Sequence, residues 1–284
     1  MHKILVVGSG TMGCGIAYAS VRGGFETVLN DVSGELLNKA LAGINQTADE
    51  AIERGKLDPA GKKAALGRLR LEPDLAEAVT GVDLVIEAVP EDIGLKCQLF
   101  GRLDQLVADH AILASNTSSL SVTEIAAATG RPERVIGMHF FNPVPKMKLI
   151  EIVRGLDTGE RAIRMVQEVA QGMGKETVLI RESPGFLTSR INALIGNEAF
   201  YMLQEGVASA PDIDKALKLG LNHPLGPFEM VDLVGLDVRL GVLHYLQDRL
   251  GEKYRPCPLL IQYVKAGRLG RKVGRGVYDY PEKT

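Results

Sequence analysis

Two residues in the middle of the chain, His139 and Glu151, have the types and the spacing to form a general acid–base pair. They lie in two apolar runs, which Pro143 and Pro145 separate. Because proline fixes φ and lacks an N–H, a helix cannot run through this stretch, so we expect a strand, a sharp turn and a returning strand. Such a hairpin can hold a carboxylate beside an imidazole, fixing its tautomer and stabilising the imidazolium for proton transfer. The alternative is that His139 only packs or pairs at a strand end, since structural ion pairs also hold histidines.

A second candidate site lies near the start of the chain, where a short apolar run precedes Gly8, Gly10 and Gly13. A stretch without helix breakers follows, and the next apolar run ends at Asp31, 18 residues after Gly13. This order of strand, glycine-rich turn, helix, strand and acid is typical of a dinucleotide-binding unit. Gly8 permits the tight turn, Gly10 lets the backbone approach a diphosphate, and Gly13 lets the helix lie close to the strand. Asp31 is placed to accept ribose hydroxyls and would repel a 2′-phosphate, which favours NAD over NADP.

The elements that must position these residues alternate between strand-like and helical patterns as far as residue 183. This predicts an α/β domain at residues 1–183, built on a Rossmann-type, mostly parallel sheet. Residues 35–54 and 58–68 read as two helices, which together would form a helical hairpin inserted after the second strand. The charges on this hairpin could be a solvated face or a grip on a phosphorylated substrate tail. Ser118 follows another predicted strand, at the end where such sheets bind ligands, although a polar turn is the simpler reading.

Beyond Ser183 the pattern is helical only, which predicts an all-α C-terminal domain at residues 184–284. Its first helix should run from about residue 186 to Glu205 and carries a broad apolar face. That face could be internal core or a subunit interface, and periodicity does not separate the two. Residues 269–278 read as a basic terminal strand or turn.

Composition describes an ordinary globular protein, with 45% hydrophobic and 24% charged residues in 284. The net charge of −2 argues against nucleic acid as a partner. The three cysteines are scattered and form no C-x-x-C pair, so we expect no disulfide framework and no metal site, and a reducing cytoplasm fits. No apolar run approaches the ~20 residues of a membrane span. We therefore expect a cytoplasmic protein that does not bind a membrane.

Together these motifs resemble those of the 3-hydroxyacyl-CoA dehydrogenase family, in particular its short bacterial 3-hydroxybutyryl-CoA dehydrogenases. The match runs from residue 3 to the end of the chain. The motifs that carry it are Gly8-x-Gly10-Thr11-Met12-Gly13, Ser115-Asn-Thr-Ser-Ser-Leu120, His139-Phe-Phe-Asn-Pro143, Glu151, Pro184-Gly-Phe186 and His223-Pro-Leu-Gly-Pro-Phe228. The resemblance implies an NAD-dependent oxidation of (S)-3-hydroxyacyl-CoA to 3-ketoacyl-CoA and the reverse reduction, in fatty acid and butanoate metabolism. It also implies an acyl-CoA substrate and a homodimer.

The resemblance assigns roles to particular residues. His139 would act as general base and acid, Glu151 would orient it, and Ser118 would hydrogen-bond the reacting oxygen. The residues implied to bind NAD are Gly8, Gly10, Thr11, Met12, Gly13, Asp31, Glu91, Lys96, Asn142 and Lys272. The residues implied to bind substrate are Ser118, Thr47, Arg54 and Ser189.

Two departures from the family pattern bear on these roles. Ser189 stands where the family usually has Asn, so it would hold the substrate oxygen with a shorter reach. Glu50 stands where some relatives carry Lys, which should weaken the attraction for coenzyme A phosphates. Two other functions stay open on the sequence: an NAD-dependent dehydrogenase of a free hydroxy acid or sugar acid, and a non-catalytic NAD-binding protein.

Overall fold

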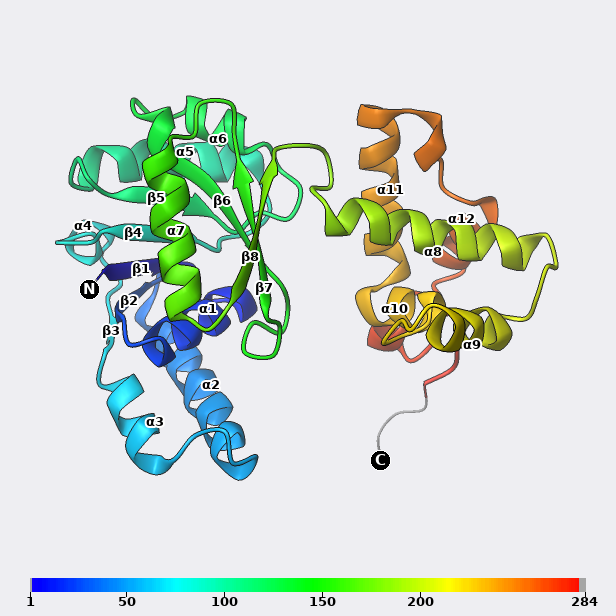
Figure 1. Cartoon of the computed structure of the whole chain (residues 1–284), viewed down its shortest axis with the longest axis horizontal. Helices are drawn as coiled ribbons and strands as arrows, with labels where there is room; N and C mark the ends of the chain where they lie inside the picture. Colours follow the sequence, from blue (N-terminus) through cyan, green and yellow to red (C-terminus); the bar gives the residue numbers. More distant parts are fainter. Residues whose placement is uncertain (1, 281–284) are drawn as a thin grey trace. The chain divides into compact units, whose positions relative to one another are not determined.

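The computed structural model describes residues 2–280, which fold into two compact units that divide between Ser183 and Pro184 (Figure 1). The N-terminal unit is built on an eight-stranded sheet in the order β3-β2-β1-β4-β5-β6-β7-β8. Its strands are β1 (Lys3–Val7), β2 (Glu26–Asn30), β3 (Leu69–Leu71), β4 (Leu84–Glu87), β5 (Ile112–Ser115), β6 (Val135–Phe140), β7 (Leu149–Arg154) and β8 (Glu176–Arg181). Neighbouring strands are parallel except β6 and β7, which are antiparallel. The predicted Rossmann-type, mostly parallel sheet is therefore confirmed.

Helices cover the sheet because its central strands are apolar on both faces. The helical elements of this unit are α1 (Thr11–Arg22), α2 (Gly34–Glu53), α3 (Pro59–Leu66), α4 (Leu75–Ala78), α5 (Ile93–Leu106), α6 (Val122–Ala127), η1 (Pro132–Arg134) and α7 (Glu160–Gly172). Alternate strand residues such as Val6, Ile86 and Met138 share one buried core with Ile16 of α1 and Val166 of α7. Side chains alternate along a strand, so Glu87 at the end of β4 and His139 in β6 face the opposite side of the sheet.

The predicted helical hairpin is formed by α2 and α3 (Figure 1). Ser33 begins α2 by accepting a hydrogen bond from the Leu36 N–H, and Asp58 begins α3 by accepting one from the Gly61 N–H. Two short elements, β3 and α4, were not predicted from the sequence. β3 has only three residues, of which the central Arg70 is exposed, so it gives no alternating apolar signal.

The C-terminal unit is helical, as predicted. Its elements are α8 (Thr188–Gln204), α9 (Ala210–Gly220), α10 (Pro227–Val234), α11 (Leu236–Leu250), η2 (Glu252–Tyr254), α12 (Pro258–Lys265) and η3 (Arg271–Val273). The basic terminal segment forms two isolated β-bridges rather than a strand. Asp232, 1% exposed, holds this segment by accepting hydrogen bonds from the Val277 and Tyr278 N–H groups and from the Tyr280 hydroxyl.

Arg239 of α11 carries a charge into the core of this unit. Its side chain is 4% exposed, its Nε has no hydrogen-bond partner, and burial lowers its pKa to about 10, so it remains protonated at neutral pH. An uncompensated buried charge destabilises a fold, and apolar replacement of buried ions often stabilises by about 1–4 kcal/mol. We therefore expect Arg239→Met to raise Tm in thermal unfolding. A lower Tm would mean that the guanidinium has a stabilising partner in solution.

Within residues 2–280, no helix combines the length and the apolar character needed to cross a membrane. The same part of the chain contains no group of three or more His, Cys, Asp or Glu side chains arranged to hold a metal ion.

Candidate active site

The strand pair β6–β7 places His139 directly opposite Glu151 in register. The His139 Nδ1 lies 2.7 Å from Glu151 Oε2, and the two residues are 7% and 0% exposed. The predicted strand, turn and returning strand are therefore confirmed. A carboxylate at this distance favours the tautomer that carries its proton on Nδ1, which leaves the lone pair of Nε2 able to accept a proton. The Phe141 ring, 4.7 Å from the imidazole between ring centroids, packs beside it.

The loop after β5 is tied to the same end of the sheet. Asn116 Oδ1 accepts a hydrogen bond of 3.0 Å from the Phe140 N–H, one residue beyond His139. Glu91 accepts hydrogen bonds from Thr117 Oγ1 at 2.6 Å, from the Ser118 N–H at 2.9 Å and from Ser118 Oγ at 3.2 Å. Glu91 therefore fixes the Ser118 loop.

A buried ion pair between Lys96 and Glu87 contacts Glu91 and so supports this loop. The Lys96 Nζ lies 2.6 Å from Glu87 Oε1 and 3.4 Å from Glu91 Oε2, and the Lys96 and Glu87 side chains are 1% and 0% exposed. Ser115 Oγ donates to Glu87 Oε2 at 2.6 Å. Burial raises the pKa of the Glu91 carboxyl, but the Thr117 hydrogen bond and the Lys96 charge outweigh it, so that pKa lies below its usual value. The Lys96 side chain is enclosed by protein, and its contact with the Ser118 loop runs through Glu91.

Glu87 was not singled out from the sequence. The available signal was its position at the end of the apolar run that forms β4. A central strand is covered on both faces, so a carboxylate there is buried and needs a cation beside it. Lys96 stands nine residues later on α5, but only the fold brings the two together.

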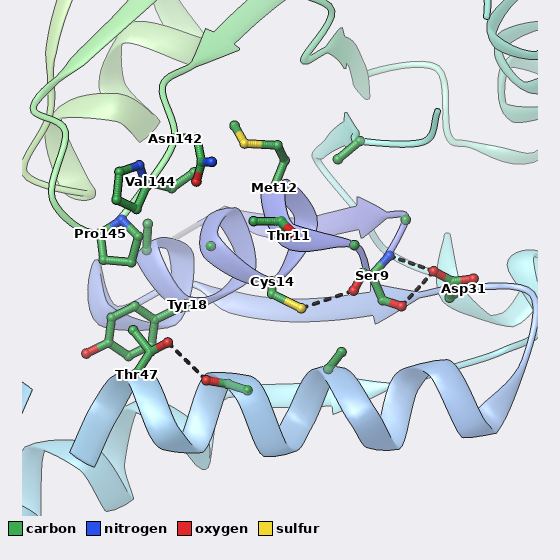
Figure 2. A pocket seen from close by; sticks show the side chains of 18 of the residues that line it. Ser9, Thr11, Met12, Cys14, Tyr18, Asp31, Thr47, Asn142, Val144 and Pro145 are labelled. Atoms are coloured by element: carbon green, nitrogen blue, oxygen red, sulfur yellow. Dashed lines mark hydrogen bonds between the residues drawn. The ribbon is translucent and has the colours of Figure 1, made fainter. Parts of the chain in front are cut away.

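A cleft of about 1270 Å³ opens over the glycine-rich turn (Figure 2). Gly8 has φ of +100°, in the region that favours glycine. A Cβ on Gly13 would lie 1.8 Å from the Gly8 carbonyl oxygen, whereas a Cβ on Gly10 would meet nothing within 4 Å. The fold itself therefore requires Gly8 and Gly13, while the open space at Gly10 is available to a ligand.

Asp31 lies in the cleft at the end of β2. Its Oδ2 accepts hydrogen bonds of 2.6 Å from both the N–H and the hydroxyl of Ser9, and its Oδ1 accepts one of 2.7 Å from the Val32 N–H (Figure 2). The carboxylate is thus fixed beside the glycine-rich turn. This is the position from which an acid can accept the hydroxyls of an adenosine ribose.

The helical hairpin forms the other end of the cleft. Thr47 and Arg54 of this hairpin line it, and Thr47 lies in the C-terminal half of α2 (Figure 2). Arg54 Nη2 lies 3.1 Å from Glu50 Oε2. An approaching phosphate would therefore compete with Glu50 for the guanidinium.

The structure gathers most of the predicted residues into two neighbouring groups in the N-terminal unit. The cleft is lined by Gly8, Gly10, Thr11, Met12, Asp31, Thr47, Arg54 and Asn142, with Gly13 buried beneath the turn. In the second group, Glu91 and Ser118 lie in the loops after β4 and β5, Lys96 lies on α5, and His139 and Glu151 lie on the paired strands β6 and β7. Asn142 connects the groups, since it lines the cleft three residues after His139.

Two predicted residues belong to the C-terminal unit. Ser189 lies in the first turn of α8. Lys272 lies in η3, where its Nζ is 2.6 and 2.7 Å from the two carboxylate oxygens of Asp237. The hydrogen bonds from Lys272 lower the pKa of the Asp237 carboxyl.

Comparisons with known proteins match both units of the chain to one family of dehydrogenases. A family model described as "3-hydroxyacyl-CoA dehydrogenase, NAD binding domain" matches residues 3–183, and one described as "3-hydroxyacyl-CoA dehydrogenase, C-terminal domain" matches residues 185–280. A probable 3-hydroxybutyryl-CoA dehydrogenase of Bacillus subtilis (strain 168) is 47% identical over 285 residues, which cover 100% of this chain and 99% of that protein. A 3-hydroxyadipyl-CoA dehydrogenase of Escherichia coli (strain K12) is 40% identical over 282 residues, 99% of this chain and 59% of that protein. The crystal structure of an (S)-3-hydroxybutyryl-CoA dehydrogenase from Ralstonia eutropha is similar with a TM-score of 0.96 and 42% identity, covering 99% of this chain and 100% of that one.

Proposed function

The chain belongs to the 3-hydroxyacyl-CoA dehydrogenase family, and on that premise we propose that it oxidises (S)-3-hydroxybutyryl-CoA with NAD and catalyses the reverse reduction of acetoacetyl-CoA. The observation that supports this reaction most strongly is the buried His139–Glu151 pair. A general acid–base pair is what the oxidation of an alcohol requires, and a protein that only stored NAD would not need one.

The cleft fits the dinucleotide. The turn residues Gly8 and Gly10 would hold the diphosphate with the first amides of α1, and Asp31 would accept the ribose hydroxyls. Asn142 would contact the nicotinamide end, close to His139. When bound, NAD accepts a hydride from C3 of the substrate, and NADH returns it in the reverse direction.

His139 would carry the proton of this reaction. In the oxidation, its Nε2 takes the proton from the C3 hydroxyl, while Glu151 stabilises the resulting imidazolium through Nδ1. In the reduction, the same nitrogen returns the proton to the developing hydroxyl. Ser118 would hydrogen-bond the substrate oxygen.

The hairpin end of the cleft supports a coenzyme A ester over a free acid. Arg22, Arg54 and Lys56 line this end with a single acid, Glu50. A free hydroxy acid has no phosphates for these cations, whereas coenzyme A has three. Thr47 lies on the same side of the helix as Arg54, seven residues away, and would contact the same nucleotide.

Arg54→Gln is therefore expected to raise KM for acetoacetyl-CoA about fivefold and to leave kcat unchanged, because an exposed charge pair contributes about 1 kcal/mol. The measurement is initial-rate kinetics with NADH against a series of 3-ketoacyl-CoA esters and against free acetoacetate. The wild-type protein should prefer the four-carbon ester, and NADH over NADPH. Equal kcat/KM for the ester and the free acid would contradict the coenzyme A assignment.

We also infer a homodimer in the cytoplasm, assembled through the helical unit. The support for an interface is the exposure of large apolar side chains there, with Val207, Leu219 and Leu221 exposed by 64%, 77% and 66%.

A further inference from the structure

One wall of the cleft is the loop that joins β6 to β7, residues 141–148. Asn142, Pro143, Val144 and Pro145 of this loop line the cleft (Figure 2). Only Val144 is buried, with 2% exposure, while Asn142 and the residues after Val144 are exposed. A loop with one buried side chain has little core of its own, so other contacts must fix its conformation.

The side chain of Lys175 supplies such a contact from outside the loop. Lys175 stands between α7 and β8, and its Nζ donates hydrogen bonds of 2.5 Å to the Val144 carbonyl and 2.6 Å to the Met147 carbonyl. Within the loop, the Lys146 and Met147 N–H groups both donate to the Pro143 carbonyl. Lys175 thus ties together two backbone positions of a turn that starts at Pro143. Its ammonium is partly desolvated there, since burial lowers the pKa of Lys175.

Val144 also packs on α1, the helix that begins at the glycine-rich turn. A Cβ on Gly15 of α1 would lie only 2.8 Å from the Val144 Cβ, so the loop rests directly on this helix where glycine leaves room. The Val144 side chain and the Val144 carbonyl therefore hold the loop from two directions, the first against α1 and the second against Lys175. Asn142 is two residues away.

We propose that Lys175 is a positioning residue, which keeps the 141–148 loop seated on α1 so that the Asn142 wall of the cleft is formed before the cofactor binds. The proposal rests on the proposed function only in taking this cleft as the NAD site. Preforming a binding loop removes its ordering cost from the binding free energy, so loss of Lys175 should appear in the affinity for cofactor. Nothing in the local sequence distinguishes Lys175 from the other lysines.

The test compares Lys175→Met with Lys175→Arg and with the matched control Lys148→Met, which removes an exposed ammonium from the same loop. We expect Lys175→Met to raise Kd for NADH about tenfold in a fluorescence titration. Hydrogen exchange at the Lys146 and Met147 amides should become faster in the same variant, with exchange in the central strands unchanged. Lys175→Arg, which keeps donors at this position, should recover most of the affinity, and Lys148→Met should match the wild-type protein.

An unchanged Kd for NADH together with unchanged loop exchange in Lys175→Met would overturn the proposal. A rise in KM for acetoacetyl-CoA with no change in either quantity would also overturn it, because Lys175 would then contact the substrate directly. Neither primary measurement uses an acyl-CoA. Failure of the proposed substrate assignment would therefore leave this result intact, and the two failures are distinguishable.

Discussion

Replacing His139 with glutamine is expected to lower kcat by roughly 10²–10⁴-fold, the range that positioned acid–base groups contribute. Glutamine can still donate to the Glu151 carboxylate, which is 0% exposed, so the variant does not leave that charge unpaired. It cannot accept the proton from the C3 hydroxyl. Initial rates with NADH and acetoacetyl-CoA measure the effect, and the Kd for NADH should remain close to the wild-type value.

The control for this prediction is Glu151→Gln, alone and combined with His139→Gln. If Glu151 acts only through the imidazole, the double variant should be about as slow as His139→Gln, because removal of a residue that orients His139 has no effect once His139 is gone. Wild-type-like turnover in His139→Gln would refute the role assigned to this residue. Fully additive losses would mean that Glu151 has a separate function.

Replacing Gly13 with alanine is expected to abolish tight NADH binding, with a loss of roughly 100-fold or more in affinity and about 3 kcal/mol in stability. The new Cβ would lie 1.8 Å from the Gly8 carbonyl oxygen and 2.8 Å from the Gly8 carbonyl carbon, so the backbone of the turn must move. Because that turn supplies the amides for the diphosphate, its displacement affects binding as well as folding. Fluorescence titration with NADH and thermal unfolding measure the two effects.

Two other glycines provide the controls for this experiment. Gly10→Ala meets nothing within 4 Å in the protein, so it should retain the wild-type Tm and lose affinity for NADH because its methyl group occupies ligand space. Gly34→Ala also meets nothing within 4 Å and lies outside the cleft lining, so it should change neither quantity. If Gly10→Ala bound NADH like the wild-type protein, the diphosphate would not approach the turn at this position.

The hairpin that carries His139 could be predicted because its signals are local. Two prolines forbid a helix, the apolar runs on either side read as strands, and antiparallel pairing then sets His139 against Glu151. The same holds for the turn after β1, where the glycine spacing and the distance to Asp31 are contained in one βαβ unit. Each of these two regions is formed by elements that follow one another directly in the sequence, so its geometry could be inferred without knowing the rest of the sheet.

The supporting contacts could not be predicted, since their partners are set by the order of strands in the sheet and by loop packing. Glu87 and Lys96 form a buried pair because α5 returns over β4, and the acid at the end of that strand was the only sign of it. Lys175 reaches the 141–148 loop because β8 runs alongside β7. The sequence around a single lysine that follows a helix does not indicate which carbonyl groups will accept its hydrogen bonds.

A single turnover probes the proposed hydride and proton transfer: the protein is loaded with one equivalent of NADH per site and mixed with excess acetoacetyl-CoA. The NADH absorbance should disappear as one 3-hydroxybutyryl-CoA of S configuration is formed per site. The His139→Gln variant should bind the same NADH but retain its absorbance over the same interval. NADH that persists in the wild-type protein after acetoacetyl-CoA is added would contradict the proposed reaction.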